Sequence, residues 1–209
     1  MQSLFPTKVD YGPLGSGTKK LNQDLLFDIT RLIPEDFEGL RWSKKNYPGG
    51  YTSYSSITDL HLRFPSFIQL RKKIDSRVRQ YIKALHYDID PRQVQMSSSW
   101  INVMPPMASH SLHLHPLSLV SGTYYVQTPP GAGEFKIEDP RLSKMMACPP
   151  RKARAPKEEQ SFFKIKPESG HLVLFESWLR HEVSANVGEG ERISISFNYE
   201  WNPQPTRPA

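Results

Sequence analysis

Glu191-Arg-Ile-Ser-Ile-Ser-Phe-Asn198 is the stretch that decides the fold. Apolar and polar side chains alternate along it, and a period of two is typical of a β-strand. Ile193, Ile195 and Phe197 would share one face and contact a core. The opposite face begins with Arg192 and, taken alone, is typical of ordinary solvent exposure. The stretch therefore predicts an amphipathic strand near the end of the chain.

Short runs of β-branched and aromatic residues, separated by turn formers, continue this pattern backwards to residue 93. Seven or eight strands at this spacing indicate a β-sandwich or barrel. A basic, proline-containing segment, 142–158, is interpreted as an insertion between two of them. The expected strands cover residues 94–104, 111–115, 119–127, 134–138, 161–166, 171–177, 181–185 and 191–200.

Two helices are expected before the strands. The first covers residues 21–33, where apolar residues recur at helical spacing. The second covers 65–85 and carries an apolar stripe opposite a basic one, with Pro65 well placed in a first turn. We expect both helices to cover one outer face of the β structure. Residues 1–20 are expected to be irregular, and 46–56 a loop.

The composition is that of a globular protein: 209 residues, of which 37% are hydrophobic and 23% charged. The single cysteine, Cys148, cannot form an internal disulfide and suits a reducing compartment. No stretch resembles a signal peptide or a membrane span, so we expect a cytoplasmic protein without a membrane partner.

The net charge of +6 is spread along the chain and does not by itself indicate a nucleic-acid partner. The densest basic cluster lies in the segment 142–158. A solvated loop explains it better than a site for an anionic partner. The cluster consists of Lys144, Arg151, Lys152, Arg154 and Lys157.

Two histidines stand one residue apart in Ser111-Leu-His-Leu-His-Pro116. On a strand, His113 and His115 would share one face and the two leucines the other. Core packing explains the leucines better than two adjacent imidazoles, which are a natural pair of metal ligands. The plainer alternative is a pair of surface histidines. His110 would lie on the face opposite His113 in a regular strand.

A third histidine follows an apolar strand and a turn in His171-Leu-Val-Leu-Phe-Glu-Ser-Trp-Leu-Arg-His181. His181 stands 66 residues after His115 and could complete a facial triad across a closed sheet. Facial ligation leaves positions on the metal open for a co-substrate and oxygen. Arg192, with Ser194 two positions on, could hold a carboxylate.

The order of these motifs resembles the 2-oxoglutarate/Fe(II) oxygenase superfamily, and more closely a group of such oxygenases found in bacteria and phages. The resemblance covers nearly the whole region after residue 95. It implies a mainly β fold with N-terminal helices, in which a double-stranded β-helix (jelly-roll) core carries helices packed on one sheet. The matching segments are Ser99-Trp-Ile-Asn102, His113-Leu-His-Pro116, Leu119-Val-Ser-Gly-Thr-Tyr-Tyr-Val126, Ile137-Glu-Asp-Pro-Arg141, Leu174-Phe-Glu-Ser-Trp-Leu-Arg-His-Glu-Val183 and Arg192-Ile-Ser-Ile-Ser-Phe-Asn198.

The length of the chain, together with this resemblance, predicts a domain organisation. All 209 residues would form a single domain. Within it, 1–92 would be an irregular N-terminus with helical support, 93–202 the catalytic jelly-roll core and 203–209 a tail.

By this resemblance the cofactors are Fe(II) and 2-oxoglutarate. The iron ligands would be His113, His115 and His181. The co-substrate would be bound by Arg192, Ser194, Tyr125 and Asn102. Trp178 would be either a wall of the pocket or a core aromatic, while His61, His86 and His171 would be ordinary structural or surface residues.

One departure from the superfamily concerns the metal motif. Its usual form is His-x-Asp or His-x-Glu, yet His115 stands at the acidic position. Three imidazoles would make the iron centre one unit more positive, and could alter metal preference or leave His115 outside the first shell. Asp139, Glu176 and Glu182 are the replacement carboxylates that we consider, each less favoured by position.

The predicted activity is oxidative decarboxylation of 2-oxoglutarate to succinate and carbon dioxide, coupled to hydroxylation of a substrate that the sequence does not identify. Two alternatives stay open. One is a three-histidine cupin-type dioxygenase that needs no 2-oxoglutarate, which Arg192 and Ser194 disfavour. The other is a non-catalytic jelly-roll module that binds a metal or ligand. The segments 46–56 and 142–158 are expected to border the substrate's path, and a homodimer is one option for assembly.

Overall fold

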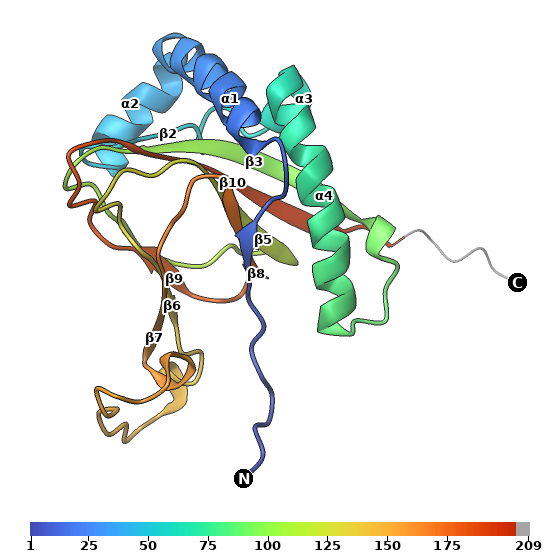
Figure 1. Cartoon of the computed structure of the whole chain (residues 1–209), viewed down its shortest axis with the longest axis vertical. Helices are drawn as coiled ribbons and strands as arrows, with labels where there is room; N and C mark the ends of the chain where they lie inside the picture. The colour runs from blue at the N-terminus through green and yellow to red at the C-terminus, as the bar shows by residue number, and fades with distance from the viewer. Residues whose placement is uncertain (204–209) are drawn as a thin grey trace, which may run out of the picture.

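The computed structural model describes residues 1–203 as two antiparallel β-sheets with helices on one side (Figure 1). The six-stranded sheet has the order β1-β8-β5-β10-β3-β2, and the four-stranded sheet the order β4-β9-β6-β7. The strands are β1 (Asp10–Pro13), β2 (Tyr51–Thr52), β3 (Val94–Met104), β4 (His110–His113), β5 (Val120–Gln127), β6 (Phe135–Glu138), β7 (Phe162–Ile165), β8 (His171–Glu176), β9 (His181–Val183) and β10 (Arg192–Trp201). The prediction of a mainly β fold with N-terminal helices is confirmed.

Four α-helices precede β3. They are α1 (Thr18–Leu32), α2 (Phe37–Asn46), α3 (Leu60–Arg63) and α4 (Pro65–Leu85). Short 3-10 turns follow or connect the regular elements: η1 (Ile33–Glu35), η2 (Pro91–Gln93), η3 (Leu142–Lys144) and η4 (Lys157–Glu159). In Figure 1, α1 and α4 lie across the outer face of the six-stranded sheet. The predicted helices on one outer face are therefore observed.

Strand β10 is central because it pairs with β3 on one side and β5 on the other. Ile193, Ile195 and Phe197 are buried in one apolar core with the inner faces of α1 and α4. That burial is why the alternating pattern of β10 fixes the orientation of the whole strand. The polar face, which includes Arg192, points to the opposite side of the sheet and is not solvent-exposed: Arg192 is 2% exposed.

The N-terminal region contains more regular structure than the sequence predicts. Strand β1 lies in the segment expected to be irregular, and pairs with β8. Strand β2 lies in the segment expected to be a loop, and pairs with β3. Both strands are short and carry no clear alternation, so their pairing depends on the neighbouring strand. Helix α2 is capped by Asp36, whose carboxylate accepts a hydrogen bond from the Gly39 N–H at 3.0 Å.

The segment 142–158 lies between β6 and β7, as expected for an insertion, and its regular structure is limited to η3 and η4. Its basic residues are exposed or partly exposed. Cys148 within it is an exposed free thiol. In the part of the chain that the structure describes, no helix is both long and apolar enough to cross a membrane.

His61 shows how the helical layer responds to pH. It lies on α3, is 5% exposed, and its Nδ1 lies 3.0 Å from Ser99 Oγ. Burial, with a contribution from nearby Arg71, lowers the pKa of His61 below its ordinary value. Below about pH 6.5 the unfolded chain therefore binds more protons at this position than the folded chain does, and acid favours unfolding.

We expect the stability advantage of the wild-type protein over a His61→Gln variant to shrink as the pH falls. The variant lacks the group that titrates differently in the two states, so this part of its pH dependence disappears. Urea unfolding of both proteins at about pH 7.5 and about pH 5.5 measures the effect. A difference in the free energy of unfolding that is the same at both pH values would contradict the assignment.

Candidate metal centre

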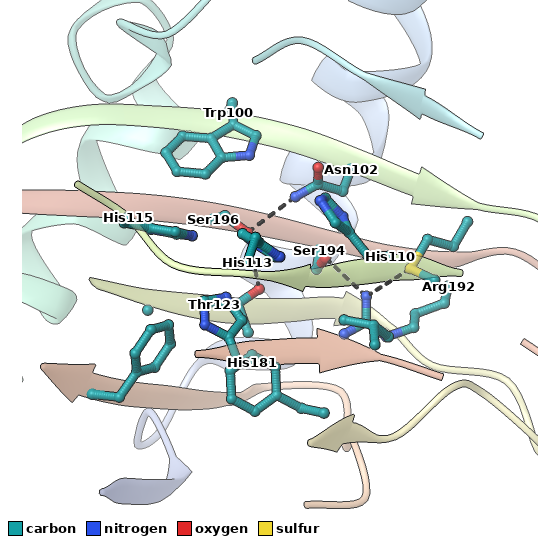
Figure 2. A pocket seen from close by; sticks show the side chains of 15 residues that line it. Trp100, Asn102, His110, His113, His115, Thr123, His181, Arg192, Ser194 and Ser196 are labelled. Atoms are coloured by element: carbon teal, nitrogen blue, oxygen red, sulfur yellow. Dashed lines mark hydrogen bonds between the residues drawn. The ribbon is translucent and has the colours of Figure 1, made fainter. Parts of the chain in front are cut away.

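A pocket of about 440 Å³, partly open to solvent, lies between the two sheets. Its walls come from β3, β5, β8 and β10 of the larger sheet and from β4, β6 and β9 of the smaller one. Figure 2 shows the polar side chains of both sheets directed toward this space. The lining residues are Trp100, Asn102, Met104, His110, His113, His115, Gly122, Thr123, Phe135, Phe175, His181, Val183, Arg192, Ser194 and Ser196.

Three histidines meet in this pocket. One ring nitrogen from each of His113, His115 and His181 lies within 4.8 Å of the others. His113 and His181 are direct partners in the pairing of β4 with β9, which explains how residues far apart in sequence come together. The structure thus brings together the three histidines that the sequence suggests as metal ligands.

His115 reaches the pocket in a different way from the one expected. Strand β4 ends at His113, so simple alternation along a strand does not place His115. Its backbone N–H instead donates to the Ser177 carbonyl oxygen at 3.0 Å. Its ring centroid lies 5.4 Å from that of His113 and 5.1 Å from that of His181.

Each imidazole of the group has an acceptor beside its Nδ1 atom. His113 Nδ1 lies 2.7 Å from the Ser111 carbonyl oxygen, and His181 Nδ1 lies 3.0 Å from that of Leu179. His115 Nδ1 lies 2.6 Å from a side-chain amide oxygen of β10. A carbonyl or amide oxygen only accepts, so each Nδ1 carries the proton and each Nε2 keeps its lone pair. This is the tautomer in which a histidine binds a metal through Nε2.

The histidine group is held in its neutral form. Burial lowers the pKa of His181 to about 2, and the neighbouring His113 adds to the effect. Burial likewise lowers the pKa of His115 to about 4, although its hydrogen bond to the amide opposes the shift. The pKa of His113 is also lowered by burial. Metal binding requires neutral imidazoles, so the ligand-free protein already has the required protonation state near neutral pH.

The carboxylates considered as replacements for His115 have other partners. Asp139 pairs with Arg141 at 2.7 Å, and Glu182 pairs with Lys136 at 2.6 Å. Glu176 accepts a hydrogen bond from the Tyr87 hydroxyl. Among residues 1–203, the metal-ligating group that contains His113 and His181 includes none of these acids. The geometry therefore favours His115 as the third ligand.

Arg192 lies at the other end of the pocket from His115 (Figure 2). Its Nη1 donates to Ser194 Oγ at 3.2 Å and approaches Met104 Sδ at 3.3 Å. Its Nε is buried without a hydrogen-bond partner, and Arg192 forms no ion pair with any of residues 1–203. A buried guanidinium without a counter-charge is unfavourable, so this end of the pocket fits an anionic ligand such as a carboxylate.

The two other predicted co-substrate residues also have unsatisfied polar atoms. Asn102 donates its amide N–H to Ser196 Oγ at 3.0 Å, but its Oδ1 is buried without a partner in the described structure. The Tyr125 hydroxyl is likewise buried and unpartnered, and burial raises its pKa. Tyr125 does not line the pocket; its ring lies beneath the Arg192 guanidinium, 5.0 Å from Cζ. The Tyr125 hydroxyl can donate to a polar ligand, whereas the Asn102 oxygen only accepts and requires a donor.

Two residues near Arg192 were missed or misplaced by the sequence analysis. The register of β4 shifts between His110 and His113, so His110 joins the same side and stacks on His113 with ring centroids 4.5 Å apart. The prediction that the two lie on opposite faces is wrong for this reason. Tyr47, which follows α2, has a buried hydroxyl without a hydrogen-bond partner. Its ring centroid lies 5.3 Å from that of His110. Tyr47 belongs to a segment without recognisable periodicity, which gives no sequence signal for its burial.

Aromatic side chains surround the histidines. The ring centroids of Phe135 and Phe175 lie 5.0 and 4.6 Å from that of His181, and the ring centroid of Trp100 lies 5.6 Å from that of His115. Trp100 carries no distinguishing signal in the sequence. Trp178, which was expected to be a pocket wall or a core aromatic, is 49% exposed, which is inconsistent with a core position, and it does not line the pocket.

Several solved structures share this fold. A prolyl-4-hydroxylase from Pseudomonas putida aligns with a TM-score of 0.62 at 15% identity, covering 94% of each chain. The non-heme α-ketoglutarate-dependent epimerase SnoN of nogalamycin biosynthesis aligns with a TM-score of 0.65 at 12% identity, covering 96% of this chain and 81% of its own. HygX from Streptomyces hygroscopicus, solved with nickel and 2-oxoglutarate, aligns with a TM-score of 0.61 at 14% identity, covering 93% and 83%. At these identities the likeness establishes the jelly-roll fold.

Sequence comparison finds one similar family. No curated protein sequence matches this chain. Residues 98–198, however, match a protein-family model described as "Putative 2OG-Fe(II) oxygenase". The matched stretch contains His113, His115, His181 and Arg192. The resemblance noted in the sequence is thereby confirmed: over residues 98–198 this chain is similar to a family of oxygenases that depend on iron(II) and 2-oxoglutarate.

Proposed function

We propose that this oxygenase hydroxylates a C–H bond of its primary substrate, with His113, His115 and His181 as the ligands of Fe(II). The observation that carries the proposal is one pocket with three neutral imidazoles at one end and an unpaired guanidinium at the other. When bound, iron(II), 2-oxoglutarate and dioxygen supply the oxidising chemistry, with succinate and carbon dioxide as products.

Arg192 is proposed to bind the distal carboxylate of 2-oxoglutarate. Its free Nε and its Nη groups offer the geometry of a bidentate contact, and Ser194 is close enough to add a hydroxyl. The Tyr125 hydroxyl lies nearby without a partner and could donate to the same ligand, whereas Asn102 on the same wall would donate through its amide N–H, because its free oxygen only accepts. These residues would orient the co-substrate along the pocket toward the histidines.

The aromatic residues around His181 are proposed to exclude water. Phe135 is 3% exposed and Phe175 is 1% exposed, and both contact the imidazole. An apolar wall at this position strengthens the contacts of Arg192 with a carboxylate, because it lowers the local dielectric constant.

The segments 46–56 and 142–158 are proposed to border the path of the primary substrate. Tyr54 is half exposed and packs edge-on against the pocket residue Trp100, with ring centroids 5.1 Å apart. The second segment follows β6, where the Glu138 N–H donates to the Arg180 carbonyl next to His181. The first segment therefore contacts a pocket residue, and the second begins four residues after a strand end that is hydrogen-bonded beside His181.

We also propose that the protein acts as a single domain in the cytoplasm, where the exposed thiol of Cys148 would stay reduced. A homodimer stays one option for its assembly, and a nucleic-acid partner is not part of the proposal.

Succinate formation tests the proposed function. Protein loaded with Fe(II) under anaerobic conditions, then given 2-oxoglutarate and oxygen, should release succinate slowly even without a primary substrate. Protein loaded with Zn(II), which has no redox chemistry, should release none. Oxygen consumption without succinate would instead indicate a 2-oxoglutarate-independent dioxygenase. Metal binding with neither oxygen consumption nor succinate would indicate a binding module.

A further inference from the structure

The backbone constrains His115 less than it constrains the other two histidines of the metal centre. Unlike His113 and His181, it lies outside a strand. Its imidazole is instead fixed by a side chain: Nδ1 lies 2.6 Å from the amide oxygen of Asn198 on β10. The other two imidazoles rest on backbone carbonyls, Ser111 and Leu179. Of the three imidazoles, only that of His115 can therefore lose the hydrogen bond to its Nδ1 through a single side-chain substitution.

A buried chain of hydroxyl groups fixes the Asn198 amide in turn. Ser121 Oγ donates to the Asn198 amide oxygen at 2.8 Å. Ser177 Oγ lies 2.7 Å from Ser121 Oγ, and both serines are fully buried. Because the amide oxygen accepts from Ser121, the Ser121 hydroxyl is available to accept from Ser177. The same amide oxygen must then accept the Nδ1 proton of His115, which leaves the Nε2 lone pair for the metal.

The backbone of β10 is irregular at this point. Asn198 stays opposite Ser121 in the pairing with β5. In the pairing with β3, however, the register shifts between Asn198 and Tyr199. Such irregularities redirect a side chain relative to the regular strand, and they recur beside functional sites. The fold thus provides a local device that sets the direction of the Asn198 side chain.

We propose that Asn198, oriented by Ser121 and Ser177, is a positioning residue that makes His115 a metal ligand. It does not contact the metal; it selects the Nδ1–H tautomer and the ring orientation of His115. The inference rests on the proposed function, because it assumes that the three histidines bind a metal. The proposal also explains how an imidazole can stand at the acidic position of the family motif. The Asn198 amide oxygen is a neutral acceptor on the Nδ1 side of the ring, so His115 would bind the metal as a neutral ligand.

Metal affinity tests the proposal. Replacing Asn198 with alanine should weaken Co(II) binding by roughly 10- to 100-fold, as for other residues that hold a ligating histidine. Asn198→Asp should restore binding to the wild-type level or better, because its carboxylate accepts the same two hydrogen bonds. The matched control is Glu200→Ala, two positions along the same strand at an exposed site. Competition titration against a chelating dye measures all four proteins.

Proton NMR of the Co(II)-loaded proteins gives a readout that a purely structural role would not change. The wild-type protein should show three exchangeable, metal-shifted Nδ1–H signals, one from each imidazole. Asn198→Ala should lose one of them, and Asn198→Asp should keep all three. Retained Co(II) affinity and three signals in Asn198→Ala would overturn the proposal.

Folding and metal binding are controlled separately. If Asn198→Ala does not fold, Ser121→Ala takes its place, and it should also weaken Co(II) binding because the amide loses its fixed orientation; unchanged affinity there would overturn the proposal equally. A wild-type protein that binds no metal would refute the proposed function itself. A wild-type protein that binds metal, with variants that bind equally well, would refute only the role of Asn198.

Discussion

A His181→Ala variant should fold but fail to retain an equivalent of Fe(II), with affinity lowered by more than about a hundredfold. Removing a residue that only positions a metal ligand typically lowers metal affinity by up to about a hundredfold. Because His181 is proposed to be a ligand itself, its removal should cost more than that. Its ring is 3% exposed and contacts both other imidazoles, with centroids 4.3 Å from His113 and 5.1 Å from His115. Anaerobic titration, followed by metal analysis of the desalted protein, measures the effect.

The control for this experiment is a histidine outside the pocket. His86 ends α4 in a left-handed conformation, φ 59°, which asparagine tolerates well, so His86→Asn should keep both the fold and full metal content. Because His181→Ala leaves a cavity, urea unfolding of the metal-free proteins should accompany the titration. Stoichiometric iron in a folded His181→Ala protein would remove His181 from the metal centre.

Much of the β core could be predicted because its strands are long or strongly patterned. The predicted bounds of β3 and α4 coincide with the observed ones. Alternation along β10 placed Ile193, Ile195 and Phe197 in the core, since a shift by one residue would have buried the polar face. Strands β1 and β2 could not be predicted in this way, because four and two residues give no pattern and their pairing is decided by the neighbouring strand.

The site was predictable as a set of residue types but not as a geometry. Family motifs named the histidines, and β4–β9 pairing brings two of them together. Strand parity, however, misplaced His110, because it assumes a regular ladder where the register in fact shifts. Asn198 carried no sequence signal of its own beyond lying on a polar face. Its contact with His115 depends on two segments 83 residues apart, and only the folded chain reveals it.

Arg192→Met should separate ligand binding from stability. Methionine fills a similar volume without charge, so the ligand-free variant should be more stable than the wild-type protein, by about 1–4 kcal/mol, since an unpaired buried charge is removed. The same change should weaken 2-oxoglutarate binding by about 2–5 kcal/mol, or roughly 30- to 5,000-fold, because the carboxylate loses its charged partner. Metal affinity should stay nearly unchanged, because Arg192 belongs to the opposite end of the pocket. Urea unfolding and calorimetric titration of 2-oxoglutarate into Mn(II)-loaded protein measure these effects.

Arg192→Lys distinguishes charge from geometry. Lysine keeps the positive charge but not the planar pair of donors, so it should bind 2-oxoglutarate with an affinity between those of the wild-type and methionine variants. A 2-oxoglutarate concentration that saturates the wild-type protein should raise its melting temperature by mass action and raise that of Arg192→Met much less. If the methionine variant instead bound 2-oxoglutarate as tightly as the wild-type protein, the buried guanidinium would have no role in holding the co-substrate. We therefore expect Arg192→Met to be more stable and to bind 2-oxoglutarate more weakly. In this interpretation the charge of Arg192 lowers the stability of the ligand-free protein and is retained because it binds the carboxylate of a ligand.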